Sequence, residues 1–247
     1  GFKLTFQSVI DIGGAALLID AVVVAFTILL GAGLGRLLKM DRDTALLTSI
    51  GSSICGAAAV LGAEPVVKSQ PYKAAVAVST VVIFGTLSMF LYPALFRAGM
   101  LDLTTEQMGL FTGATLHEVA HVVGAGNAMG QAISDPAIIV KMIRVMMLAP
   151  VLVILSIILS RREAAAGQTG QKRKITIPWF AFLFLAVIGF NSLHLLPSGV
   201  VSAINSLDTF LLTMAMTALG AESSFEKFKK AGARPFLLAA LLYAWLF

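Results

Sequence analysis

Two imidazoles and a carboxylate lie close together in one apolar segment of this chain. His117, Glu118 and His121 stand among Gly, Ala, Val and Thr residues and match the pattern H-E-x-x-H. On a continuous helix the two imidazoles would share a face and could bind zinc, with Glu118 as the general base of an intramembrane metalloprotease. In a carrier, Glu118 would instead bind a proton with His117 as its partner. A hydrogen-bonded structural pair between helices is the third explanation.

Two basic residues form a second candidate group. Lys141 and Arg144 are three positions apart and would share one helical face near the outer end of their segment. An arginine presents a planar fork that suits an oxyanion, so the pair could attract an anion or neutralise a buried carboxylate. Snorkelling of both side chains to the membrane interface is the alternative. Asp20 is a further ionisable residue within an apolar segment.

Polar and small residues interrupt two other apolar segments, at 48–59 and at 205–213, and each segment runs on into the letters LGAE. Weakened hydrophobic segments at corresponding places in two halves of a membrane protein point to the substrate site of a transporter. We therefore expect two crossing broken helices. The expected substrate ligands are Ser52, Ser53, Cys55 and Gly56 from the first segment and Asn205, Asp208 and Thr209 from the second. Coincidence between common membrane residues is the alternative for the shared letters.

The composition requires elements that lie in a membrane. Hydrophobic residues make up 58% of the 247 residues and charged residues 13%, with a mean hydropathy of +0.91. Eight apolar segments are long enough to be read as spans. They are residues 12–38, 45–67, 72–96, 108–129, 136–160, 178–197, 200–221 and 235 onward. Because the last segment is short, we expect the chain to be a fragment of a longer protein.

The basic residues orient these spans. With strict alternation, thirteen Lys and Arg residues fall on one side of the membrane and three on the other. The majority are Arg36, Lys39, Arg42, Arg97, Arg161, Arg162, Lys172, Arg173, Lys174, Lys227, Lys229, Lys230 and Arg234, and the minority are Lys3, Lys68 and Lys73. The majority side is cytoplasmic by the positive-inside rule, and so is the linker at 161–177. The net charge of +5 therefore reflects orientation and predicts no nucleic-acid partner.

The two interrupted segments run in opposite directions across the membrane in this arrangement. We therefore predict an all-α, polytopic inverted-repeat transporter. Residues 1–106 would hold the end of the first repeat, with about three spans, and residues 107–247 would hold the second, with about five.

Several stretches resemble the YeiH family of uncharacterised bacterial inner-membrane proteins, to which sulfate export has been assigned by inference. They are GFKLTF at 1–6, GSSICGAAAV at 51–60, EPVV at 64–67, VIFG at 82–85, HEVA at 117–120, KMIRV at 141–145, ITIPWF at 175–180 and LDTFLL at 207–212. The resemblance implies kinship with the fold of sodium/proton antiporters and bile-acid sodium symporters. Members of this family usually carry glutamine where this chain has His121. For the protease, Asp208 would be the third zinc ligand, but Thr209 follows it where site-2-type proteases carry glycine.

The sequence thus predicts a carrier rather than an enzyme. It would transport a small inorganic anion, such as sulfate or another sulfur oxyanion, by alternating access, coupled to H⁺ or Na⁺ through Asp208 or Glu118. The chain contains no G-x-x-x-x-G-K loop for ATP, and we expect no cofactor. An intramembrane protease with zinc on His117 and His121, or an anion channel, is the alternative. The sequence leaves a homodimer open.

Overall fold

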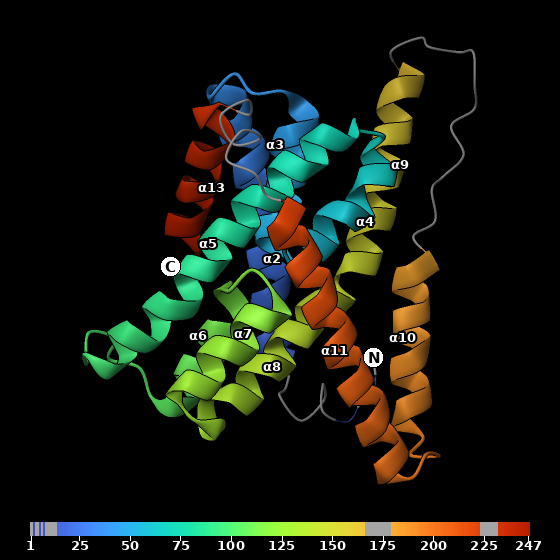
Figure 1. The fold of residues 1–247 in the computed structure, drawn as a ribbon. Helices are drawn as coiled ribbons and strands as arrows, with labels where there is room; N and C mark the ends of the chain where they lie inside the picture. Colours follow the sequence, from blue (N-terminus) through green and yellow to red (C-terminus); the bar gives the residue numbers. More distant parts are fainter. Residues whose placement is uncertain (1, 3–4, 6, 8–13, 166–178, 223–231) are drawn as a thin grey trace.

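The computed structural model describes residues 2, 5, 7, 14–165, 179–222 and 232–247, and within these residues it contains helices and no strand (Figure 1). The helices are α2 (Gly14–Leu37), α3 (Arg42–Ser53), α4 (Ala57–Val67), α5 (Pro71–Arg97), α6 (Thr105–Thr115), α7 (Val119–Met129), α8 (Gln131–Met146), α9 (Leu148–Ala165), α10 (Trp179–Ser192), α11 (Ser198–Glu222) and α13 (Ala233–Leu246). Leu17–Leu37, Pro71–Arg97 and Gln131–Arg161 are long and apolar enough to cross a membrane. The expectation of an all-α membrane protein is confirmed.

Helices α3 and α4 form a hairpin that turns back inside the protein. The side chain of Asp41 caps α3 by accepting a hydrogen bond from the Thr44 amide, and α3 ends at Ser53. Lys73, in the first turn of α5, lies 2.9 Å from Asp41 and 2.8 Å from Asp43 through its Nζ atom. If α4 continued the direction of α3, its end would lie roughly 35 Å from Asp43, at 1.5 Å per residue. The short loop after α4 cannot span that distance, so α4 must return to the end where α3 begins.

Helices α6 and α7 form a second hairpin. A capping box between Thr104 and Gln107 starts α6, which ends at Thr115. A Cβ added at Gly109 of α6 would meet Pro136 of α8, and one added at Gly126 of α7 would meet Ser134. Both arms therefore lie side by side against the first half of α8.

The two hairpins enter from opposite ends of the molecule. Figure 1 shows α3 and α4 in the upper half and α6 and α7 in the lower half. Each has its own apolar core, one joining α2, α3, α4, α5 and α9 and the other joining α5, α6, α7 and α8. The expectation that residues 45–67 and 108–129 each cross the membrane is therefore wrong, because both segments turn midway and return.

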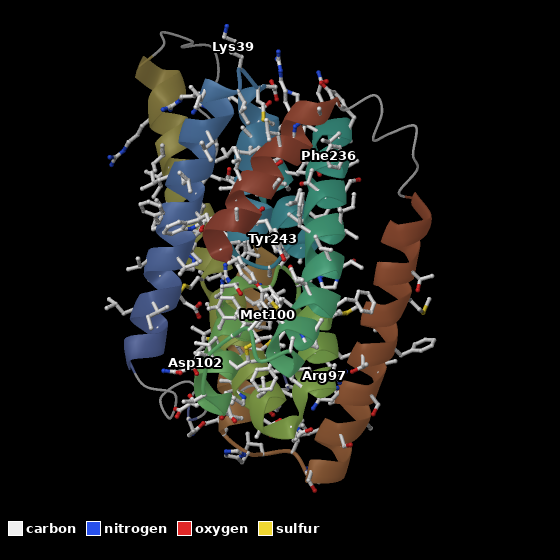
Figure 2. All side chains as sticks on the ribbon, turned by 90° about the vertical axis from the view of Figure 1, so that its left-hand side faces the viewer. Lys39, Arg97, Met100, Asp102, Phe236 and Tyr243 are labelled. Atoms are coloured by element: carbon white, nitrogen blue, oxygen red, sulfur yellow. The ribbon has the colours of Figure 1, made fainter. Side chains whose placement is uncertain are left out.

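This turn changes the sidedness of the charges. Among the described residues, the basic side chains at the α3 entry end are Arg36, Lys39, Arg42, Lys68, Lys73, Arg161 and Arg234, and Arg97 lies at the other end. Figure 2 shows Lys39 and Arg97 towards opposite ends. The hairpins thus bring Lys68 and Lys73 to the basic end and take Arg97 away from it. The positive-inside rule assigns the basic end to the cytoplasm.

The second expected break is absent. Helix α11 runs without interruption through residues 205–213. Thr209 Oγ1 donates to the Asn205 carbonyl at 2.8 Å, and Ser206 Oγ donates to the Ser202 carbonyl at 3.0 Å. These polar side chains bond to their own helix, which is how Ser and Thr persist inside a helix. The expected linker at 161–177 lies outside the described residues from 166 onward.

Candidate functional site

The tips of the two hairpins meet at Lys141. Lys141 is fully buried on α8, and its Nζ donates to the Ile54 and Leu116 carbonyls at 2.6 Å each. Ile54 follows the last residue of α3, and Leu116 follows the last residue of α6. Carbonyls at helix C-terminal ends lack intrahelical partners and carry partial negative charge. A single side-chain nitrogen therefore donates to a carbonyl of each hairpin tip.

Glu118 provides the complementary contact. It is the N-cap of α7, and its Oε1 accepts a hydrogen bond from the Ala57 amide, the first residue of α4, at 3.0 Å. A carboxylate is favourable there because a helix N-terminus carries partial positive charge. Gly56 permits the contact, since its φ is +68° and a Cβ would lie 2.2 Å from Glu118 Cγ. Each tip thus places a charged or partly charged group against the other.

Arg144 and Asp20 form a loosely matched pair beside the tips. Both side chains are fully buried. Arg144 Nη2 donates to the Ser53 carbonyl. The guanidinium Nε lies 3.9 Å from Asp20 Oδ1, which is too far for a hydrogen bond. Arg144 Nε and Nη1 and both Asp20 oxygens have no hydrogen-bond partner among the described residues. Snorkelling of Lys141 and Arg144 to an interface is therefore wrong.

The H-E-x-x-H residues do not form the helical arrangement that a zinc protease needs. His117 and Glu118 lie in the break between α6 and α7, and only His121 is helical. His121 approaches Thr86 Oγ1 at 3.4 Å through Nε2 and Glu118 Oε2 at 3.9 Å through Nδ1. No group of three or more metal-ligating side chains occurs within the described part of the chain. The expected i, i+4 pairing of the two imidazoles on one continuous helix is wrong.

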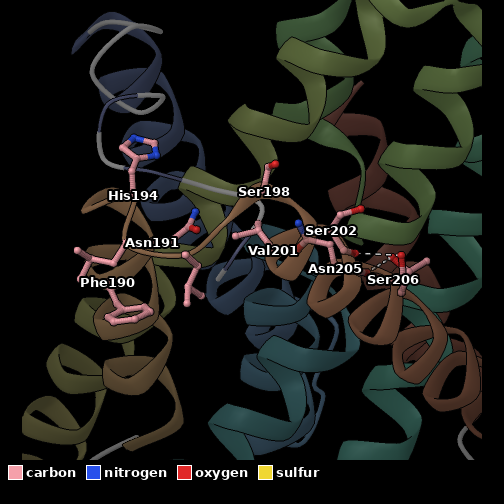
Figure 3. Close-up of a pocket in the computed structure, with 11 residues that line it drawn as sticks. Phe190, Asn191, His194, Ser198, Val201, Ser202, Asn205 and Ser206 are labelled. Atoms are coloured by element: carbon pink, nitrogen blue, oxygen red, sulfur yellow. Dashed lines mark hydrogen bonds between the residues drawn. The ribbon is translucent and has the colours of Figure 1, made fainter.

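The structure gathers most of the predicted site and separates the rest. Most of the predicted site residues lie at or beside the two tips. They are Ser52, Ser53, Cys55, Gly56, His117, Glu118, His121, Lys141 and Arg144. Asn205, Asp208 and Thr209 lie on α11, where the carboxylate of Asp208 is exposed. Asn205 and Thr209 line a different cavity of about 840 Å³ between α10 and α11 (Figure 3). The predicted union of these two groups in one site is therefore not formed.

Two further buried hydroxyls lie within two helical turns of the tips, and the sequence did not predict them as site residues. Thr48 and Thr112 are fully buried, and their hydroxyl oxygens lack a partner among the described residues. The hydroxyl of Ser52, which the sequence did predict as a ligand, also lacks a partner among the described residues. Nothing in the sequence distinguished Thr48 and Thr112, because threonines are common in membrane helices, where they form hydrogen bonds between helices. Two buried carboxylates, two buried cations and these hydroxyls form a polar centre that suits a small charged ligand.

The fold and the site thus define the class of protein. It is an α-helical membrane protein with two opposed hairpins and a buried ionic centre. The chain matches over residues 1–239 the family described as Conserved hypothetical protein 698, and it belongs to this family. It is 66% identical over 247 residues to a UPF0324 membrane protein of Bacteroides thetaiotaomicron, covering 100% of this chain and 74% of the relative.

Other relatives carry the same description. The chain is 51% identical over 248 residues to a UPF0324 membrane protein of Bordetella bronchiseptica, and 49% identical over 247 residues to the UPF0324 inner membrane protein YeiH of Escherichia coli K12. All of this chain is covered in both cases, against 77% and 70% of the relatives. No solved structure matches significantly. The resemblance to the YeiH family and the membrane location are confirmed.

Proposed function

We propose that the protein is a secondary active transporter that carries a small anion through the membrane, coupled to H⁺ or Na⁺. The observation that carries this proposal is the buried centre where two hairpin tips meet on Lys141. Burying a charged group in a membrane is costly, and such residues mark ion or substrate paths. A purely structural core could use apolar side chains instead.

The free face of Arg144 favours an anion as the substrate. Its Nε and Nη1 make no hydrogen bond to a described residue, so the guanidinium keeps N–H donors that can bind an oxyanion. Lys141 cannot replace it, because two of its three protons already serve the Ile54 and Leu116 carbonyls. Sulfate and other sulfur oxyanions are candidates that present several acceptor oxygens.

Opposed hairpins support alternating access within an inverted repeat. The unit α3–α4–α5 begins with a hairpin from one end, and α6–α7–α8 begins with a hairpin from the other. Inverted repeats bind substrate near the membrane midplane, where irregular backbone lines the site. We infer that movement of one unit against the other opens the tips to each side in turn. The relationship to the antiporter and symporter fold remains part of this proposal.

The test is flux of labelled sulfate in proteoliposomes with imposed pH and sodium gradients. We expect uptake that follows one gradient and is reduced roughly 10- to 100-fold by Arg144→Gln, the range for losing hydrogen bonds to a charged group. Arg161→Gln, at the exposed end of α9, is the matched control and should transport as the unchanged protein does. Undiminished uptake by Arg144→Gln would contradict the site. Flux that ignores every gradient would indicate the channel instead.

A further inference from the structure

Asp20 and Arg144 lie close together but do not form a hydrogen-bonded ion pair. A buried ion pair repays the cost of removing two charges from water only when its geometry is good and its remaining polar atoms are bonded. Here the closest approach is 3.9 Å, and neither oxygen of Asp20 accepts a hydrogen bond from a described residue. The pair therefore contributes little to holding the helices together, and each side chain can bind a different partner.

The charges that face Asp20 come from one helix. Arg144 and Lys141, both on α8, act on its carboxylate. Helices α3, α6 and α13 also pack against α2, but their described residues add no further charge that acts on Asp20. Lys141 is held by the two hairpin tips, so Arg144 is the cation that can change partners.

A largely apolar cavity borders Asp20. Asp20 lines a cavity of about 210 Å³ between α2, α6 and α8, together with apolar residues and Thr115. This volume has room for several water molecules. Both Asp20 oxygens are buried in this conformation, so a proton reaches the carboxylate only when the site opens to water.

An oxyanion bound to the Nε–H of Arg144 would lie close to Asp20, because Nε is 3.9 Å from Asp20 Oδ1. Two adjacent negative charges in a buried site repel each other, and a proton on one of them removes the conflict. We propose that Asp20 is the proton-coupling residue: the anion takes the place of the Asp20 carboxylate on Arg144, and Asp20 takes up one proton as the anion binds. The anion and the proton then cross together and leave together. This inference rests on the proposed transport function and names its coupling ion and coupling residue.

Proton uptake during binding is the direct test. Sulfate or sulfite is added to the purified protein in weakly buffered solution, and a pH dye reports the protons taken up while radiolabel reports the anion bound. By linkage we expect about one proton per bound anion, and tighter anion binding as the pH falls. Asp20→Asn should bind the anion with no proton uptake and no dependence on pH. Asp102→Asn, an exposed carboxylate, is the control and should behave as the unchanged protein.

The outcomes separate this inference from the transport function. If the unchanged protein binds neither anion, both proposals fall. If it binds an anion without proton uptake, or only when sodium is present, the transport function stands and the role of Asp20 is overturned. Unaltered proton uptake by folded Asp20→Asn would overturn that role as well. Even if the variant does not fold, anion binding without proton uptake by the unchanged protein overturns the role of Asp20.

Discussion

Gly85 on α5 leaves the space that the His121 ring occupies. A Cβ at this position would lie 2.4 Å from Nδ1 and 2.6 Å from Cε1 of His121. We expect Gly85→Ala to push the ring away from Thr86 and Glu118 and to lower the free energy of unfolding by about 1–3 kcal/mol, the usual cost of overpacking. Thermal unfolding in detergent measures the loss, and sulfate uptake should fall with it.

Gly33 on α2 provides the matched control for this substitution. A Cβ there would meet nothing within 4 Å. Gly33→Ala should leave stability unchanged or raise it by up to about 1 kcal/mol, because alanine favours a helix more than glycine does. Equal stability of the two variants would show that His121 does not need the space beside Gly85.

Lys141 should be the most sensitive cation for stability. Lys141→Met leaves the Ile54 and Leu116 carbonyls without a donor and removes a positive charge from the site. A buried group left without its hydrogen-bond partner costs about 1–3 kcal/mol. We expect a loss of that size in chemical unfolding, with little loss for Lys68→Met, since Lys68 is exposed at the end of α4. Similar losses in both variants would contradict the bridging role.

At the scale of the elements, the hairpins make a labelling prediction. Cys55 is the chain's one cysteine, so Cys55→Ala provides a background for single cysteines at Met40, Gln70 and Met100. A hairpin of α3 and α4 places positions 40 and 70 on the same face of the membrane and position 100 on the opposite face. Membrane-impermeant maleimide, applied to intact spheroplasts and inverted vesicles, reports the accessible face. Labelling of positions 40 and 70 from opposite faces would contradict the hairpin and show that residues 45–67 cross the membrane.

The sequence predicted the first break but could not predict the return of the chain. Small residues around Gly56 weaken the segment, and the break falls at residues 54–56 as expected. Hairpin arms of 12 and 11 residues together have the length of one span, so hydropathy cannot distinguish turning back from crossing. The salt bridges of Lys73 with Asp41 and Asp43 show that the chain turns back, but these contacts are known only once the fold is known.

The second break was assigned to the wrong segment for a local reason. Asn205, Ser206 and Thr209 looked like helix-weakening residues, but the Ser206 and Thr209 hydroxyls bond to carbonyls of their own helix. The true break at His117 and Glu118 has neither Gly nor Pro, and its ionisable residues indicated chemistry rather than a turn. The chemical part of the site was therefore more predictable than the backbone that holds it.

At the scale of the whole molecule, transport requires the hairpin tips to reach water. Cys55 lies in the tip of the first hairpin with 5% of its surface exposed, so it can report this opening. Alternating access predicts slow modification by a charged methanethiosulfonate at rest and several-fold faster modification when sulfate and a proton gradient drive turnover. The increase arises because the tips separate only while the carrier changes state.

The reagent must act on Cys55 and not on a general loosening of the protein. Cys55→Ser removes the chain's one thiol and should abolish modification under both conditions. Arg144→Gln keeps the thiol but binds the anion more weakly, so its rate should rise much less when sulfate and the gradient are applied. A rate that is the same at rest and during turnover in the unchanged protein would mean that the tips stay closed, and the moving hairpins would have to be abandoned as the basis of transport.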